Sequence, residues 1–151
     1  SVKKIIASGF GVGLIWEKYL PKYKGGGTLA SALFALALYI IKLEVLTIGL
    51  ITGILYLIYF YVVSDEEAQN DPSWITLDEM IGMGIASLSS PSQGIPLFVS
   101  FLVFRISDIL KEPSLVKDME KIPGKKGVLY DDVVAGVIGL IAGSIVRQFI
   151  A

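Results

Sequence analysis

The stretch VLTIGLITGILYLIYFYVV, residues 45–63, decides the fold, because none of its 19 side chains is charged. An apolar segment of this length can cross the hydrocarbon core of a bilayer as a single α-helix. Residues 28–41 form another uncharged run, and only the break Lys42-Leu43-Glu44 separates it from the first. The two runs predict a tight hairpin of short transmembrane helices.

Two further apolar segments follow. Residues 80–104 are uncharged, but the Ser-, Pro- and Gly-containing stretch 89–94 divides them into halves, each of roughly ten residues and too short to span alone. They form either one kinked span or a re-entrant helical hairpin. Residues 133–146, VVAGVIGLIAGSIV, carry glycines at helical spacing, which predicts close packing against a neighbouring helix.

Composition agrees with this pattern. The chain has 151 residues, of which 54% are hydrophobic, too many for an ordinary soluble domain of this size. We therefore expect an all-α, polytopic integral membrane protein in which residues 1–151 form one domain, a small bundle of short transmembrane helices. A formal net charge of -1 without a basic stripe excludes nucleic-acid binding, and the absence of Cys and His excludes disulfides, zinc sites and phosphocysteine or phosphohistidine chemistry.

The distribution of charge predicts the topology. Lys and Arg concentrate in the first 24 residues and in residues 105–132, and the positive-inside rule places both segments in the cytoplasm. A single crossing by residues 80–104 would move the second basic segment outside. A re-entrant segment that turns at residues 91–94 avoids this conflict and leaves all the prominent carboxylates on one face.

Two adjacent carboxylate pairs stand out, Asp78-Glu79 and Asp131-Asp132, each expected at the N-terminal end of a helix. Helix capping explains such acids. Two acids at each of two membrane-boundary positions also supply the hard oxygen ligands that Mg²⁺ prefers, so metal binding is the second interpretation.

Other residues suit phosphate. Arg105, Asp108 and Lys111 recur at i, i+3 and i+6 along one side of a helix. They form either a solvated face with an ion pair or a phosphate clamp beside a metal ligand. The stretch Gly25-Gly26-Gly27-Thr28 precedes a helix, where backbone N–H groups can receive phosphate, although short glycine patterns more often mark turns or close packing.

Taken in order, these motifs resemble the phosphatidylglycerophosphatase A family of bacterial membrane lipid phosphatases over nearly the whole chain. The residues that carry the resemblance are FGVGL at 10–14, Asp71-Pro72 and Ile75, DEMIGM at 78–83, FRI at 104–106 with Asp108, Lys111 and Pro113, then Gly127 and DDVVAG at 131–136. The first glycine-rich loop departs from the family's Pro-Gly-Thr-x-Gly-Ser/Thr pattern, because in Tyr23-Lys24-Gly25-Gly26-Gly27-Thr28 only Gly27 and Thr28 match.

The resemblance implies a Mg²⁺-dependent enzyme that hydrolyses phosphatidylglycerophosphate to phosphatidylglycerol and inorganic phosphate, a step of phospholipid biosynthesis. It implies a multi-pass protein of the bacterial inner (cytoplasmic) membrane whose active site faces the cytoplasm. Its partners are then the lipid substrate and membrane lipids. The sequence leaves open whether the protein forms a homo-oligomer.

The expected roles of the site residues follow from their chemistry. Mg²⁺ ligands are expected from four carboxylates: Asp78, Glu79, Asp131 and Asp132. Asp108 is a further ligand or the base that orients a metal-activated water, and Arg105 and Lys111 steady the phosphate charge. Gly27 and Thr28 are expected to contribute to substrate binding.

Two other function classes remain open at this point. A CDP-alcohol phosphatidyltransferase is one, since residues 131–136 are similar to the opening of that family's motif, but the second half of the motif is missing. The other is a transporter or membrane scaffold without enzyme activity. Acids at helix ends rather than mid-span disfavour this last class.

Overall fold

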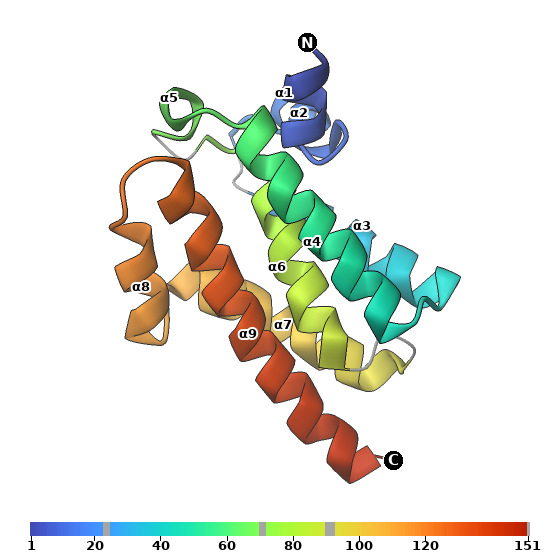
Figure 1. The fold of residues 1–151 in the computed structure, drawn as a ribbon. Coiled ribbons are helices and arrows are strands. Elements are labelled where there is room, and N and C mark those ends of the chain that lie inside the picture. The colour runs from blue at the N-terminus through green and yellow to red at the C-terminus, as the bar shows by residue number, and fades with distance from the viewer. Residues whose placement is uncertain (23–24, 70–71, 90–92, 151) are drawn as a thin grey trace.

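A computed structural model of the protein describes residues 1–22, 25–69, 72–89 and 93–150. Every regular element in these ranges is a helix, so the all-α prediction is confirmed (Figure 1). The elements are α1 (Val2–Ala7), α2 (Val12–Tyr19), α3 (Gly26–Ile41), α4 (Val45–Val62), α5 (Asp65–Ala68), α6 (Leu77–Ala86) with the short 3-10 helix η1 (Ser87–Ser89), α7 (Gly94–Leu110), α8 (Ser114–Glu120) and α9 (Lys125–Ile150).

The short helix α6 lies at the centre of the bundle and packs against α3, α4, α7 and α9. Its contacts with α4 and α9 form the main core, in which Tyr59, Ile81 and Leu129 are fully buried. Glycines permit this close approach. A Cβ on Gly136 of α9 would lie 2.5 Å from the carbonyl oxygen of Gly82 in α6, which confirms the close packing predicted for the last apolar run.

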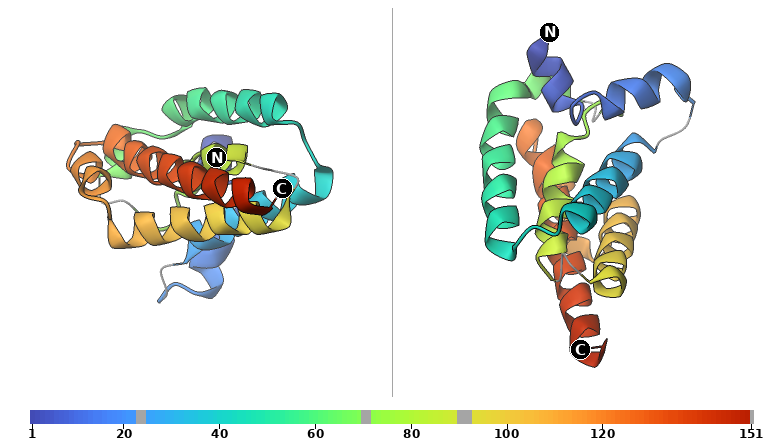
Figure 2. Two further views of the ribbon diagram at one scale, coloured as in Figure 1. Left: turned by 90° about the horizontal axis from the view of Figure 1, so that it is seen from below. Right: turned by 90° about the vertical axis from the view of Figure 1, so that its right-hand side faces the viewer.

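The predicted hairpin of the first two apolar runs is wrong in its packing. The helices α3 and α4 do follow one another, but they diverge from the turn at Lys42, and each packs against α6 instead of against the other (Figure 2). The reason is the small-residue surface of α6. Gly84 leaves room for Thr52 of α4, and the start of α6 contacts the start of α3.

The helices α6 and α7 run in opposite directions, which excludes a single kinked span. The start of α6 and the end of α7 lie together at one end of the bundle, and both helices pack along α9. This arrangement matches the hairpin alternative. The turn predicted at residues 91–94 includes positions 91 and 92, which lie outside the described residues.

The bundle has a polar end, where α3, α6 and α9 begin and α4 and α7 end. Hydrogen bonds hold the end of α4 to the start of α9. Tyr59 near the end of α4 donates to the carbonyl oxygen of Lys125 at 2.8 Å, and Lys125 Nζ donates to the carbonyl oxygens of Phe60 and Val63 at 2.9 and 3.0 Å. Lys125 thus satisfies carbonyl groups at the end of α4 that have no partner within the helix.

Within the described residues, two helices, α4 and α9, are long and apolar enough to cross a membrane. Only 28% and 22% of their most apolar windows are buried inside the bundle. Large apolar side chains on the outer surface include Leu46, Leu57 and Phe149, which are 73%, 70% and 86% exposed. Packing within this chain therefore leaves most of the apolar surface of the two helices uncovered.

Candidate active site

The structure brings the two predicted carboxylate pairs together at the polar end. Asp78 and Glu79 lie in the first turn of α6, and Asp131 and Asp132 lie in the second turn of α9. Carboxylate oxygens of Asp78, Glu79 and Asp132 lie within 4.8 Å of one another, as do those of Asp108, Asp131 and Asp132. Asp132 belongs to both groups and therefore joins the five acids into one cluster.

The expectation that Asp131 and Asp132 begin a helix is wrong, because α9 begins six residues earlier, at Lys125. These two carboxylates are therefore not caps. They point from the side of α9 into the bundle, where they are only 3% and 2% exposed.

The four predicted ligands share an unusual feature, since each has one buried carboxylate oxygen without a hydrogen-bond partner. A buried oxygen left without a partner costs free energy, and a group of them is retained only where something compensates the charge. The atoms in this cluster that could ligate a metal are all carboxylate oxygens, the ligand type that Mg²⁺ prefers. These ligand atoms therefore fit a hard divalent cation.

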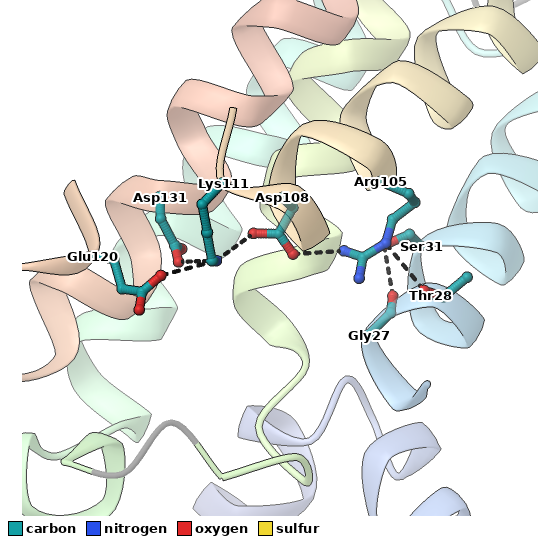
Figure 3. Close-up of polar contacts among 8 residues, drawn as sticks. All are labelled: Gly27, Thr28, Ser31, Arg105, Asp108, Lys111, Glu120 and Asp131. Carbon is teal, nitrogen blue, oxygen red and sulfur yellow. Dashed lines mark hydrogen bonds and ion pairs between the residues drawn. The ribbon is translucent and has the colours of Figure 1, made fainter. Parts of the chain in front are cut away.

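Two cations border the carboxylate cluster (Figure 3). Asp108, in the last turn of α7, accepts from Arg105 Nη1 at 3.1 Å and from Lys111 Nζ at 3.2 Å. Lys111 Nζ also donates to Asp131 Oδ2 at 2.7 Å. The predicted alignment of Arg105, Asp108 and Lys111 along one side of a helix is thus present. Through Lys111 it contacts Asp131, one of the candidate metal ligands.

Lys111 ends α7 with a left-handed backbone, φ 55°, which turns its side chain back toward the cluster. Burial lowers the pKa of the Lys111 ammonium, but the carboxylates of Asp108 and Asp131 outweigh this effect, so the pKa lies above its ordinary value. Lys111 therefore carries its positive charge throughout the neutral range and can offer it to a phosphate.

A cleft of about 580 Å³ opens beside these cations. Its lining includes Gly27, Thr28, Glu79, Arg105 and Lys111. Arg105 Nε donates to Thr28 Oγ1 at 3.1 Å, which links α7 to the first turn of α3. The N–H groups of such a first turn have no partner within the helix and favour an anion.

Gly27 has a steric reason to be glycine. A Cβ at this position would lie 2.5 Å from Glu79 Oε1. Glu79 can therefore reach the cluster only because the first turn of α3 has no side chain at this point. Both residues predicted for this loop, Gly27 and Thr28, are at the site.

Glu120 is a site residue that the sequence did not indicate. Its carboxylate lies 3.7 Å from Lys111 Nζ across the start of α9, and its side chain is 55% exposed. Glu120 is one of two acids on the short helix α8, and nothing in the local sequence indicates this contact. Asp71 of the Asp71-Pro72 motif, and Tyr23 and Lys24 of the first glycine-rich loop, lie outside the described residues.

Comparisons with known proteins agree with this geometry. The family model for phosphatidylglycerophosphatase A matches residues 5–147. Phosphatidylglycerophosphatase A of Escherichia coli is 28% identical over 136 residues, which cover 89% of this chain and 77% of that protein. A putative phosphatidylinositol-3-phosphatase of Bacteroides thetaiotaomicron is 40% identical over 83 residues, 53% of this chain and 52% of the relative, so that this match spans about half of each.

No solved structure matches the chain. The family model covers nearly all of the sequence, including every residue of the carboxylate cluster and both cations beside it. The chain therefore belongs to the phosphatidylglycerophosphatase A family, a family of lipid phosphatases, which are phosphoric monoester hydrolases.

Proposed function

We propose that this protein is a Mg²⁺-dependent phosphatidylglycerophosphatase that converts phosphatidylglycerophosphate to phosphatidylglycerol and inorganic phosphate in phospholipid biosynthesis. One observation carries the proposal: five convergent carboxylates, four of them with a buried oxygen that lacks a partner, lie beside Arg105 and Lys111, and two of the five, Glu79 and Asp108, line an open cleft. The name of the Escherichia coli relative supplies the substrate.

Electrostatics supports a metal in this site. Five carboxylates face two cations, so the bare cluster would repel a phosphate monoester rather than bind it. Asp78, Glu79, Asp131 and Asp132 would hold the ion or ions, with Asp108 within reach as a further ligand. Bound there, Mg²⁺ supplies an activated water and offsets the negative charge of the phosphate.

The chain's own residues bind and orient the phosphate. Arg105 is held by Asp108 on one side and Thr28 on the other, so its guanidinium is positioned before the substrate arrives. Its remaining N–H groups and the Lys111 ammonium donate to non-bridging oxygens, where negative charge spreads in the transition state. The N–H groups at the start of α3 lie across the cleft.

Asp108 can orient the attacking water through its carboxylate and accept its proton. The water oxygen forms a bond to phosphorus, the bond from phosphorus to the ester oxygen breaks, and the leaving alkoxide takes up the proton that Asp108 accepted to become the free hydroxyl of phosphatidylglycerol. Arg105 and Lys111 keep Asp108 in place throughout.

We place the protein in the inner (cytoplasmic) membrane with the polar end toward the cytoplasm. Among the described cations, only Lys42 and Arg147 lie toward the other end of the bundle, at the end of α3 and near the end of α9. The remaining Lys and Arg residues in the described part of the chain lie on segments at or beside the polar end, as the positive-inside rule requires of a cytoplasmic face.

Cysteine labelling tests this orientation, because the chain contains no cysteine of its own. Single cysteines at the exposed positions Gln69, Lys121 and Lys42 are treated with a membrane-impermeant maleimide. We expect Gln69→Cys and Lys121→Cys to react only in inverted vesicles and Lys42→Cys only from the outside. Reaction of Gln69→Cys and Lys121→Cys from opposite sides would be incompatible with one shared site.

A panel of purified lipids tests the reaction. We expect the fastest phosphate release from phosphatidylglycerophosphate, compared with phosphatidylinositol 3-phosphate and phosphatidic acid. Faster release from phosphatidylinositol 3-phosphate would assign instead the activity named for the Bacteroides relative. If none of the three lipids releases phosphate, the proposed function is wrong.

A further inference from the structure

A second hollow lies between α3 and α7, with a volume of about 400 Å³ and an almost entirely apolar lining. Small residues make the space, since Ala32, Ala35 and Gly94 contribute little bulk. Leu36, Tyr39, Leu97, Phe98 and Phe101 complete the lining. We call this hollow the α3–α7 groove.

The groove lies along the same two helices as the cleft of the active site, and about one helical turn separates their linings, from Thr28 to Ala32 on α3 and from Phe101 to Arg105 on α7. Where α3 and α7 meet at the polar end, Thr28 accepts the hydrogen bond from Arg105. Eleven residues further along α3 is Tyr39, and eleven residues back along α7 is Gly94, where the Tyr39 ring lies 3.6 Å from the position a Cβ would take. The two helices therefore run antiparallel in register, with the phosphate-binding pair at one end of the groove and Tyr39 over Gly94 at the other.

The distance from Thr28 and Arg105 to the far end of the groove matches one leaflet of a bilayer. Eleven residues of α-helix rise about 16 Å, close to half of the roughly 30 Å hydrocarbon thickness. The groove is also open toward the outer surface, because Leu36 and Phe98 remain 53% and 58% exposed. A molecule can thus enter it sideways from the membrane.

We propose that the α3–α7 groove binds one acyl chain of the lipid phosphomonoester whose phosphate lies in the cleft between Thr28 and Arg105. This inference rests on the proposed function and names how that site selects a membrane lipid over a soluble phosphate ester. The apolar lining recognises the chain, and each methylene group it shields contributes to binding. The antiparallel register sets the distance between chain and phosphate.

Photo-crosslinking tests the occupant without depending on turnover. Phosphatidylglycerophosphate with a diazirine on one acyl chain is incorporated into vesicles with the full-length protein, and adducts are mapped by mass spectrometry. We expect adducts in residues 32–39 and 94–101 that excess unlabelled phosphatidylglycerophosphate removes. Adducts spread over the outer face of α4, or equal labelling of the groove by phosphatidylcholine with the same diazirine chain, would overturn the proposal.

A pair of matched variants tests the effect on catalysis. Ala32→Phe fills the groove, whereas Ala37→Phe adds the same ring to an exposed position of α3 outside it. With a long-chain substrate we expect Ala32→Phe to raise KM by about tenfold, the effect of excluding about two methylene groups, and Ala37→Phe to leave it unchanged. With a short-chain, dihexanoyl substrate both variants should match the wild type.

The outcomes separate the two proposals. Equal effects of Ala32→Phe on long-chain and short-chain substrates, or no effect on either, would reject the groove while leaving the phosphatase assignment intact. A wild-type protein that releases phosphate from neither substrate would reject the proposed function itself.

Discussion

Replacing Asp132 with asparagine is expected to reduce phosphate release from phosphatidylglycerophosphate by roughly 10³-fold, which corresponds to a loss of about 4 kcal/mol of transition-state stabilisation. Asp132 is 2% exposed and is the one acid that belongs to both groups of converging carboxylates. Asparagine keeps the shape of the side chain but removes a charge and one anionic ligand atom. The measurement is the rate of phosphate release in mixed micelles at saturating Mg²⁺.

The control for Asp132→Asn is Asp118→Asn, the same change on the exposed surface of α8. Asp118 is 57% exposed and forms only a loose ion pair, 3.7 Å, with Lys121, so we expect no change in rate. Thermal unfolding in detergent without divalent cations should show Asp132→Asn at least as stable as the wild type, because it replaces a buried acid whose charge the four neighbouring carboxylates oppose. A near-wild-type rate for Asp132→Asn would leave these acids without a role as metal ligands.

The helical fold could be predicted because the length of each apolar segment can be read directly from the sequence. The uncharged residues 45–63 predict α4, and the spacing of the glycines in α9 indicates its close contacts with neighbouring helices. The packing of α3 and α4 could not be predicted in the same way. It depends on α6, a helix of ten residues, whose small residues let both α3 and α4 pack against it. Nothing in the sequence of α3 or α4 indicates that a third helix lies between them.

The site was predictable by residue type and only partly by position. Arg105, Asp108 and Lys111 lie within two turns of one helix, so their alignment follows from helical spacing alone. The meeting of Asp78 with Asp132 depends on the path of the chain through α7 and α8, and the sequence suggested it only through the assumption of one shared membrane face. The start of α9 was misplaced because Pro123 and Gly124 resemble a longer loop, whereas the helix begins directly after them, at Lys125.

Removal of divalent cations is expected to abolish turnover completely, a larger effect than any single substitution in the site. The four carboxylate oxygens without hydrogen-bond partners, in Asp78, Glu79, Asp131 and Asp132, have no protein group that could replace an ion among the described residues. Lys111 already donates to Asp108 and Asp131, so it is not free to neutralise the rest. After exhaustive dialysis against EDTA, phosphate release should fall to background and return on addition of Mg²⁺.

Thermal unfolding separates metal binding from a general salt effect, because an ion that binds only the folded state raises its stability by an amount set by concentration and affinity. At 100 times the dissociation constant this amounts to about 2.7 kcal/mol. We expect Mg²⁺ to raise the Tm of the wild type and of Asp118→Asn, with little effect on Asp132→Asn, whereas an equal ionic strength of NaCl should raise none of them. An EDTA-treated protein that keeps full activity would contradict the metal site, and an equal rise of Tm in all three proteins would place the ion elsewhere. Together the two measurements assign the loss of activity to this cluster. An ion held between α6 and α9 explains why both the rise in Tm and the turnover depend on Mg²⁺ and on Asp132.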